Sequence, residues 1–287
     1  MIKYYLVHGG DKIREERMNV EFVKWGINNV SWVLHPNKDE LTEELMNQIV
    51  TQSPSMSCDR MVMPSEMLLR RGKISCSYKH YLCLHDIIYN GYEYAVIMED
   101  NSYFSDNIPL LMDRWIKQLN EVYGQEKWDI LFNLYSTDDW ATYSDGPIIE
   151  GLEVYPKTNE IINQCLGGTK SANFYLLTNK CAKILFENYI PFNSTPEMWM
   201  NDLFRKLNIK SFWAHPGCVH IEKDHTSTTS GLDFISYAHP IRTDSGLMFS
   251  PTDHQPVTSP NNNEYDDLYK TITVTGIYHS STFPEYY

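Results

Sequence analysis

Residues 94–101 read Tyr94-Ala95-Val96-Ile97-Met98-Glu99-Asp100-Asn101, a short apolar run that stops at two adjacent carboxylates. The apolar residues follow one another without polar alternation, which indicates a strand covered on both faces in a mostly parallel sheet. In open α/β sheets, ligands bind beyond the carboxyl ends of the strands. Glu99 and Asp100 are therefore expected where a metal ion, a phosphate-bearing ligand or a proton transfer is handled. The alternative is that the two acids simply end a strand in a solvated turn.

The rest of the chain alternates between short apolar runs and segments with apolar residues at helical spacing. The runs predict strands, and their alternation with helices indicates βαβ units and an α/β fold. The further strands are expected at 3–7, 30–34, 128–134, 173–177 and 210–213, and the helices at 14–25, 40–50, 75–89, 110–122, 179–188 and 196–207.

Charge narrows the choice of partners. The chain has 287 residues, enough to bury a full core, and its 37 acidic residues outnumber 24 basic ones for a formal charge of −13. No basic stripe offers a phosphate footprint, so a nucleic-acid partner is not expected.

The cysteines and the apolar runs indicate an intracellular protein. The six cysteines form no Cys-x-x-Cys pair, and at this density they predict reduced thiols rather than a disulfide scaffold. The opening apolar run is too short for a signal peptide, and no segment reaches the length of a transmembrane helix. We therefore expect a cytoplasmic location.

Two regions of the chain differ in how clearly their sequence predicts secondary structure. Residues 1–230 hold all of the clear strand and helix patterns and are expected to form one domain. Residues 231–287 include a Pro/Asn/Ser-rich stretch and predict an irregular C-terminal extension packed on that domain.

Four segments, taken in order, resemble the family 25 glycosyltransferases, which are lipooligosaccharide and collagen sugar transferases. They are Tyr5–Gly10 with the following Arg14 and Arg17, Gly72–His80, Asn173–Ala182 and Thr195–Glu197. The family's Glu-Asp-Asp reads Glu99-Asp100-Asn101 here, its Ser-His reads Lys79-His80, and its helix-start Asp is Glu197.

The resemblance implies a GT-A-like, Rossmann-like sheet flanked by helices, a nucleotide-sugar donor and inversion at the anomeric carbon. It implies a reaction that moves a hexose from a UDP-sugar to a hydroxyl of a glycan or protein acceptor. It also implies a divalent cation, Mn²⁺ or Mg²⁺, because a departing diphosphate needs a counter-ion.

Asp100 is the first expected metal ligand, and Glu99 is either a second ligand or a contact of the donor sugar. Asn101 offers only a neutral carbonyl, so it would hold a hard cation less tightly than the family's Asp. Further ligands are expected from His220 and His225, although both histidines also fit a solvated surface loop. A compact zinc spacing is absent from this late segment.

The donor contacts expected from the resemblance and from residue chemistry are His8, Arg14, Arg17, Glu99, Thr226 and Ser227. The arginines lie one turn apart on a helix and suit a diphosphate, although two basic residues are equally ordinary on a solvated helix face. His80 has apolar residues at helical spacing, so a packed core histidine is the favoured interpretation.

Inversion needs a general base for the acceptor hydroxyl. Glu197 matches the family position, and Asp202 on the same expected helix is the second candidate. An acid in the first turn of a helix is also favoured by the helix dipole alone.

Two rival functions remain open from the sequence. One is a catalytically degenerate relative that binds carbohydrate, marked by Asn101 and Lys79. The other is a metal-dependent hydrolase that uses Asp100 and the late histidines.

Overall fold

The structure is a computed structural model of the whole chain. It describes residues 1–51, 69–133, 151–157, 172–215 and 217–220, together with the backbone of 161–162, 165–166, 221 and 277–279. Most of the expected C-terminal extension, 231–287, lies outside the described residues.

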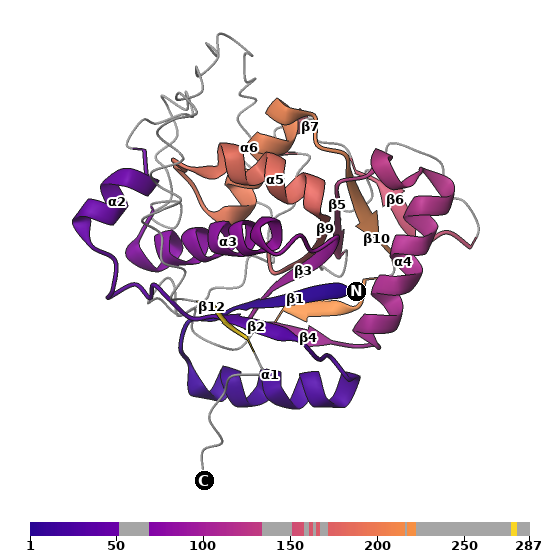
Figure 1. Cartoon of the computed structure of the whole chain (residues 1–287), viewed down its shortest axis with the longest axis horizontal. Helices are drawn as coiled ribbons and strands as arrows, with labels where there is room; N and C mark the ends of the chain where they lie inside the picture. The colour runs from indigo at the N-terminus through magenta and orange to yellow at the C-terminus, as the bar shows by residue number, and fades with distance from the viewer. Residues whose placement is uncertain are drawn as a thin grey trace, which may run out of the picture.

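The described elements alternate largely as the sequence predicts (Figure 1). The helices are α1 (Lys12–Trp25), α2 (Glu43–Ile49), α3 (Arg71–Tyr89), α4 (Ile108–Val122), α5 (Asn179–Tyr189) and α6 (Pro196–Leu207), with a 3₁₀ turn η2 (Gln125–Lys127). The strands are β1 (Ile2–Val7), β2 (Val30–Val33), β3 (Tyr94–Glu99), β4 (Ser102–Phe104), β5 (Ile130–Asn133), β6 (Val154–Pro156), β7 (Ile161–Ile162), β8 (Cys165–Leu166), β9 (Phe174–Thr178), β10 (Ser211–Ala214), β11 (Val219–Ile221) and β12 (Ile277–His279).

The central sheet has the strand order β12-β2-β1-β3-β9-β5-β10-β6. Five of its eight described strands, β1, β2, β3, β5 and β10, run in one direction, while β9 runs against both β3 and β5. The edge strands β6 and β12 are also antiparallel to their neighbours. The expected α/β fold is therefore confirmed, with a mixed sheet that is mostly parallel.

Helices cover both faces of this sheet, which explains why β3 is an unbroken apolar run. Figure 1 shows α2, α3, α5 and α6 on one side of the sheet and α1 on the other. Each side has its own buried apolar cluster: one joins α3, α5 and α6 to the sheet, and the other joins α1 and α4 to it.

Side-chain caps set the starts of α1 and α2, which the apolar pattern alone misplaced. Helix α1 begins at Lys12 rather than at the expected residue 14, because the Asp11 carboxylate accepts hydrogen bonds from the backbone N–H of Ile13 and Arg14. Helix α2 is shorter than expected and starts after Thr42, whose hydroxyl oxygen accepts from the N–H of Leu45. Helix α3 starts at Arg71, one turn before the expected residue 75.

A substitution of Phe132 on β5 tests whether the hydrophobic core is packed as described. The Phe132 side chain is only 1% exposed, and its ring centroid lies 5.7 Å from those of Tyr175 and Phe204. Phe132→Ala is expected to lower the free energy of unfolding by about 3–5 kcal/mol, because it removes buried apolar surface and leaves a cavity. Chemical denaturation measures the change, and Leu110→Ala, at a residue 66% exposed on α4, is the control with an effect within about 0.5 kcal/mol. Equal losses in the two variants would contradict the described core.

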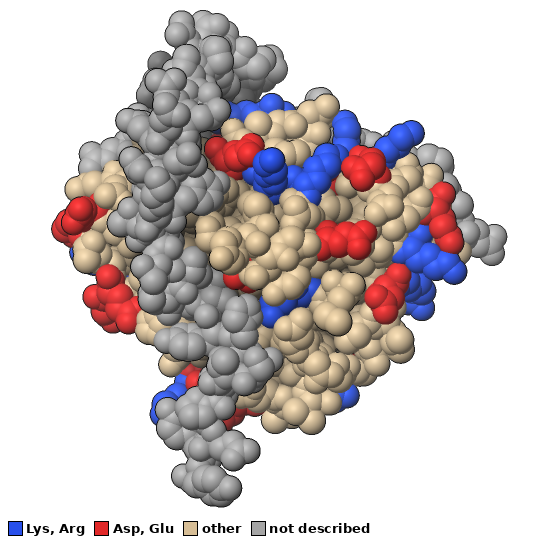
Figure 2. Space-filling view, in the orientation of Figure 1, with Lys and Arg blue, Asp and Glu red and all other residues tan. Residues whose placement is uncertain are grey.

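Charged side chains of both signs lie on the described surface. On the face drawn in Figure 2, acidic and basic side chains are interspersed, and the described residues form no continuous basic stripe there. Among the described helices, none combines the length and the apolar character needed to cross a bilayer.

Candidate functional site

The carboxyl ends of β1, β2 and β3 meet at one edge of the sheet. Val7 is in register with Val33 on one side and with Glu99 on the other. Beyond these ends, the N–H of Asp100 donates to the carbonyl of Val7 at 3.1 Å, and the N–H of Glu99 donates to the carbonyl of Asn173 at 2.8 Å. The strand pattern thus brings the β1–α1 turn and the two acids together, as the sequence predicts.

The carboxylate of Asp100 is held by three donors from the β1–α1 region. Its Oδ2 lies 2.8 Å from Nδ1 of His8 and accepts the N–H of Gly9 at 2.8 Å, while Oδ1 accepts from Arg14 at 2.9 Å. Asp100, His8 and Arg14 are all buried. The structure therefore unites three of the expected site residues in one ion-paired cluster.

These partners decide the charge of Asp100. Burial alone would raise the pKa of the carboxyl group, but the hydrogen bonds from His8 and Gly9 and the positive charge of Arg14 outweigh it, so the pKa lies below its ordinary value. Asp100 is consequently an anion that fixes the turn between β1 and α1. Gly10 in this turn has φ +87°, a left-handed conformation that glycine adopts without steric cost.

Two more cations surround this turn. Arg17 donates to the backbone carbonyl of Asp100, and its guanidinium carbon lies 4.1 Å from the ring centroid of Tyr103. The buried Lys79 of α3 donates to the carbonyl of His8 at 2.8 Å and to Oδ1 of Asn37 at 2.7 Å. Burial lowers the pKa of Lys79 to about 8, against the opposing influence of neighbouring groups that include Asp100.

Two nitrogen atoms of His8 and Arg14 make no hydrogen bond with the described residues. Nε2 of His8 and Nε of Arg14 are buried and have no hydrogen-bond partner among the described residues. Buried polar atoms without a hydrogen-bond partner are rare in folded proteins, and a bound ion or water is one explanation for them. We name His8, Arg14, Arg17 and Lys79 the basic cluster.

Glu99 belongs to a second group of side chains at the same edge. Its Oε1 lies 3.3 Å from Nε2 of His80 and 3.7 Å from Sγ of Cys76, both on α3. Nδ1 of His80 lies 2.8 Å from the hydroxyl of Tyr175, and the two rings are stacked. The expectation that His80 packs in the core is met by its complete burial, but it also touches Glu99.

Glu197, at the start of α6, lies near Glu99. Its Oε1 accepts the hydroxyl of Thr195 at 2.6 Å. Burial raises the pKa of Glu197, the negative charge of Glu99 raises it further, and the hydrogen bond from Thr195 opposes the change. A carboxyl group whose pKa is raised toward neutrality is a stronger base than an ordinary glutamate.

Asp202, the second candidate base, is turned away from this group. It follows Glu197 by five residues, about 140° round the helix, and pairs with Arg205 at 2.6 Å. The structure therefore separates the two candidates and puts only Glu197 beside Glu99.

The remaining expected metal ligands are placed only in part. Oδ1 of Asn101 accepts from the side-chain amide of Asn173. His220 lies on β11, opposite Tyr103 of β4, and Ile221 lies opposite Ser102. The chain thus reaches the vicinity of Asp100 and Asn101 at the end of β11, while His225, Thr226 and Ser227 lie outside the described residues.

Three residues near these strand ends carried no predicted binding or catalytic role: Cys76, Lys79 and Asn173. Cys76 and His80 are four residues apart on one helix, and this spacing puts their side chains on the same face. Lys79 occupies a position where the family has serine. This departure from the family pattern was the feature of the sequence that could have pointed to Lys79. The contacts of Asn173 depend on β9 running antiparallel to β3, which the local pattern does not reveal.

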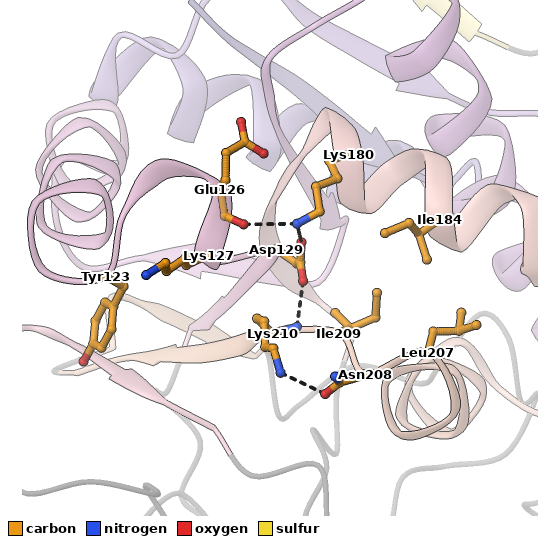
Figure 3. A pocket seen from close by; sticks show the side chains of 10 residues that line it. All are labelled: Tyr123, Glu126, Lys127, Asp129, Lys180, Ile184, Leu207, Asn208, Ile209 and Lys210. Carbon is orange, nitrogen blue, oxygen red and sulfur yellow. Dashed lines mark hydrogen bonds and ion pairs between the residues drawn. The ribbon is translucent and has the colours of Figure 1, made fainter.

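A cavity of about 530 Å³ lies at the other end of the parallel strands, where β5 and β10 begin (Figure 3). Its lining includes Lys127, Lys180 and Lys210, near the first residues of β5 and β10. Lys180 pairs there with Asp129 at 2.9 Å, and the backbone N–H of Lys210 donates to the same carboxylate. The basic cluster and the acids lie at the carboxyl ends of β1, β2 and β3, away from this cavity.

The chain has an α/β fold, and paired cations and carboxylates gather at the carboxyl ends of β1 and β3. A family model described as glycosyltransferase family 25 (LPS biosynthesis protein) matches residues 39–202, more than half of the chain. The chain belongs to this family of glycosyltransferases. It is a transferase, and its family implies a sugar donor and a glycan acceptor. No curated protein matches the chain.

Proposed function

We propose that the protein is an inverting glycosyltransferase that takes a hexose from a UDP-sugar and attaches it to a hydroxyl of a glycan or protein acceptor. The main support is the separation of charge at the carboxyl edge. The basic cluster gathers beside the β1–α1 turn, and Glu99 and Glu197 gather beside the start of α6.

The basic cluster suits the diphosphate of the donor. Three cations lie near Asp100: Arg14 pairs with its carboxylate, Arg17 donates to its backbone carbonyl, and Lys79 donates to the carbonyl of His8. Guanidinium groups bind phosphate oxygens with paired hydrogen bonds, and their charge offsets the charge that develops as the diphosphate leaves. Asp100 holds these groups in place, because its hydrogen bonds join the turn and α1.

The two glutamates suit the sugar end of the reaction. The acceptor oxygen forms a bond to the anomeric carbon while the bond from that carbon to the diphosphate oxygen breaks. Glu197 takes the proton of the acceptor hydroxyl, and the electron pair of the broken bond stays on the diphosphate. Glu99, which lies near His80 and Glu197, is expected to contact the donor sugar.

The Mn²⁺ or Mg²⁺ expected from the resemblance stays a prediction. Both carboxylate oxygens of Asp100 accept hydrogen bonds, and the cation of Arg14 lies 2.9 Å from Oδ1. The side-chain oxygen of Asn101 is bonded to Asn173. As they lie here, these two residues do not fit a hard dication, which needs several free oxygen ligands. We derive no step of the reaction through a metal ion.

Binding of UDP tests the proposal. We expect UDP to raise the melting temperature of the protein in the presence of EDTA, because a ligand that binds only the native state stabilises it. Arg17→Ala should weaken UDP binding about 10–100-fold by removing a charged donor. Arg205→Ala, on α6 and paired with Asp202, is the matched control and should leave the affinity unchanged.

Three results would bear against the proposal or refine it. The absence of any shift with millimolar nucleotides would contradict nucleotide-sugar use. Binding of UDP without transfer to any of a panel of glycan acceptors would favour the degenerate binding module. Metal-dependent hydrolysis of the donor with no transfer to an acceptor would favour the metal-dependent hydrolase.

A further inference from the structure

Cys76, His80 and Glu99 present three different ligand atoms to one point at the carboxyl edge. The sulfur, a ring nitrogen and a carboxylate oxygen all lie within 4.8 Å of one another. Cys76 and His80 come from successive turns of α3, and Glu99 ends β3. Because a helix and a strand of the central fold supply them, the three groups are held by packing rather than by a loop.

Two of the three distances between these atoms agree with a tetrahedral zinc site. With Zn–S bonds of about 2.3 Å and Zn–N or Zn–O bonds of about 2.0–2.1 Å, tetrahedral angles separate sulfur and oxygen by about 3.5 Å and nitrogen and oxygen by about 3.3 Å. The structure has 3.7 Å between Sγ of Cys76 and Oε1 of Glu99, and 3.3 Å between Nε2 of His80 and the same oxygen.

The surroundings of His80 match a metal-bound histidine. Ligating histidines use their second ring nitrogen in a hydrogen bond that fixes the ring and the tautomer. Nδ1 of His80 lies 2.8 Å from the hydroxyl of Tyr175, and stacking on the same tyrosine fixes the plane of the ring. Nε2 is thereby directed toward Glu99.

We propose that Cys76, His80 and Glu99 form a Zn²⁺ site. A thiolate, an imidazole and one carboxylate favour Zn²⁺ over Mg²⁺ or Mn²⁺, which prefer oxygen ligands alone. The thiol of Cys76 releases its proton to solvent when the sulfur binds the metal. Three protein ligands leave one coordination position for water, and Glu99, with a side chain 21% exposed, gives the site an opening to solvent. The site is separate from the cluster around Asp100 but shares Glu99 with the proposed contact to the donor sugar. It is argued from the geometry of these three residues, and its metal test requires no sugar transfer.

Metal binding by the full chain, freed of metal by a chelator, tests this proposal. We expect one equivalent of Zn²⁺ to bind in competition with a chromophoric indicator. Co²⁺ in its place should give the charge-transfer absorption of a cobalt–thiolate bond. Cys76→Ala should remove this absorption and weaken Zn²⁺ binding at least about 100-fold, since even a partner of a ligand contributes 10–100-fold to affinity.

Two further variants keep the test sharp. Cys83→Ala removes a buried thiol from the same helix, and its Zn²⁺ affinity and Co²⁺ spectrum should equal those of the unchanged protein. Tyr175→Phe keeps the ring but removes the hydroxyl at Nδ1 of His80, and it should weaken Zn²⁺ about 10–100-fold.

The proposal is overturned if Cys76→Ala, shown by circular dichroism to be folded, keeps the Zn²⁺ affinity or the thiolate absorption. It is also overturned if the unchanged protein binds Co²⁺ with no thiolate absorption. Should Cys76→Ala fail to fold, Cys76→Ser and Tyr175→Phe are measured instead, and unchanged Zn²⁺ affinity in both contradicts the site.

Discussion

Glu197→Gln is expected to lower the rate of sugar transfer by about two to four orders of magnitude, the usual contribution of a general base. Glutamine keeps the shape of the side chain and can still accept the hydroxyl of Thr195, but it cannot take a proton. Affinity for UDP should remain unchanged, because in the proposed arrangement the base faces the acceptor and the diphosphate binds at the basic cluster. Initial rates at saturating donor and acceptor measure the effect.

Asp202→Asn is the control for this loss, since it removes a carboxylate from the same helix on a side that pairs with Arg205. Its rate should stay near that of the unchanged protein. A loss at Asp202 with none at Glu197 would reassign the base. The pH dependence adds a second readout: the pKa of Glu197 is raised above its ordinary value, so the rate should rise with pH as this group loses its proton. The Glu197→Gln variant should lack that rise.

Asp100→Asn is expected to destabilise the fold by about 3–5 kcal/mol and to abolish UDP binding. The substitution leaves the guanidinium of Arg14 buried without its counter-ion, and an unpaired buried charge costs that much. It also turns an amide N–H toward donors of His8, Gly9 or Arg14, so the turn beside the basic cluster loses its anchor. Chemical denaturation and UDP titration at low temperature measure the two effects.

The matched control is again Asp202→Asn, because Asp202 also pairs with an arginine but lies partly exposed, where such a pair contributes about 0–1 kcal/mol. Equal stability of the two variants would contradict the anchoring role of Asp100. The sign of the pH effect follows from the pKa of Asp100, which is lowered in the folded state. Its stabilisation is complete above the unfolded value of about 3.9 and is lost as the pH falls through the folded value.

Much of the fold follows from local pattern. Unbroken apolar runs marked the buried strands, and β3 ends at Glu99 as the run predicts. Helix starts were less accurate because side-chain caps such as Asp11 and Thr42 decide them, and a cap acts independently of the apolar spacing. The antiparallel direction of β9 could not be predicted from the local pattern, because pairing between strands distant in the chain depends on the whole topology.

The sequence predicted several residues of the candidate site but not the contacts between them. Position at the ends of strands and the family resemblance pointed to His8, Arg14 and Asp100, which the structure joins directly. Their partnership as an ion-paired cluster could not be predicted, because hydrogen-bond partners far apart in the chain leave no local pattern. The different surroundings of Glu197 and Asp202 depend on how α6 packs against the rest of the fold. The sequence alone is compatible with both acids lying on the exposed side of this helix.

A crystal structure of the protein with bound UDP tests the central claim most directly. We predict that the diphosphate lies within hydrogen-bonding distance of the guanidinium of Arg17 and beside the turn formed by His8, Gly9 and Gly10. Density for UDP in the cavity lined by Lys127, Lys180 and Lys210, with the β1–α1 turn empty, would contradict the account.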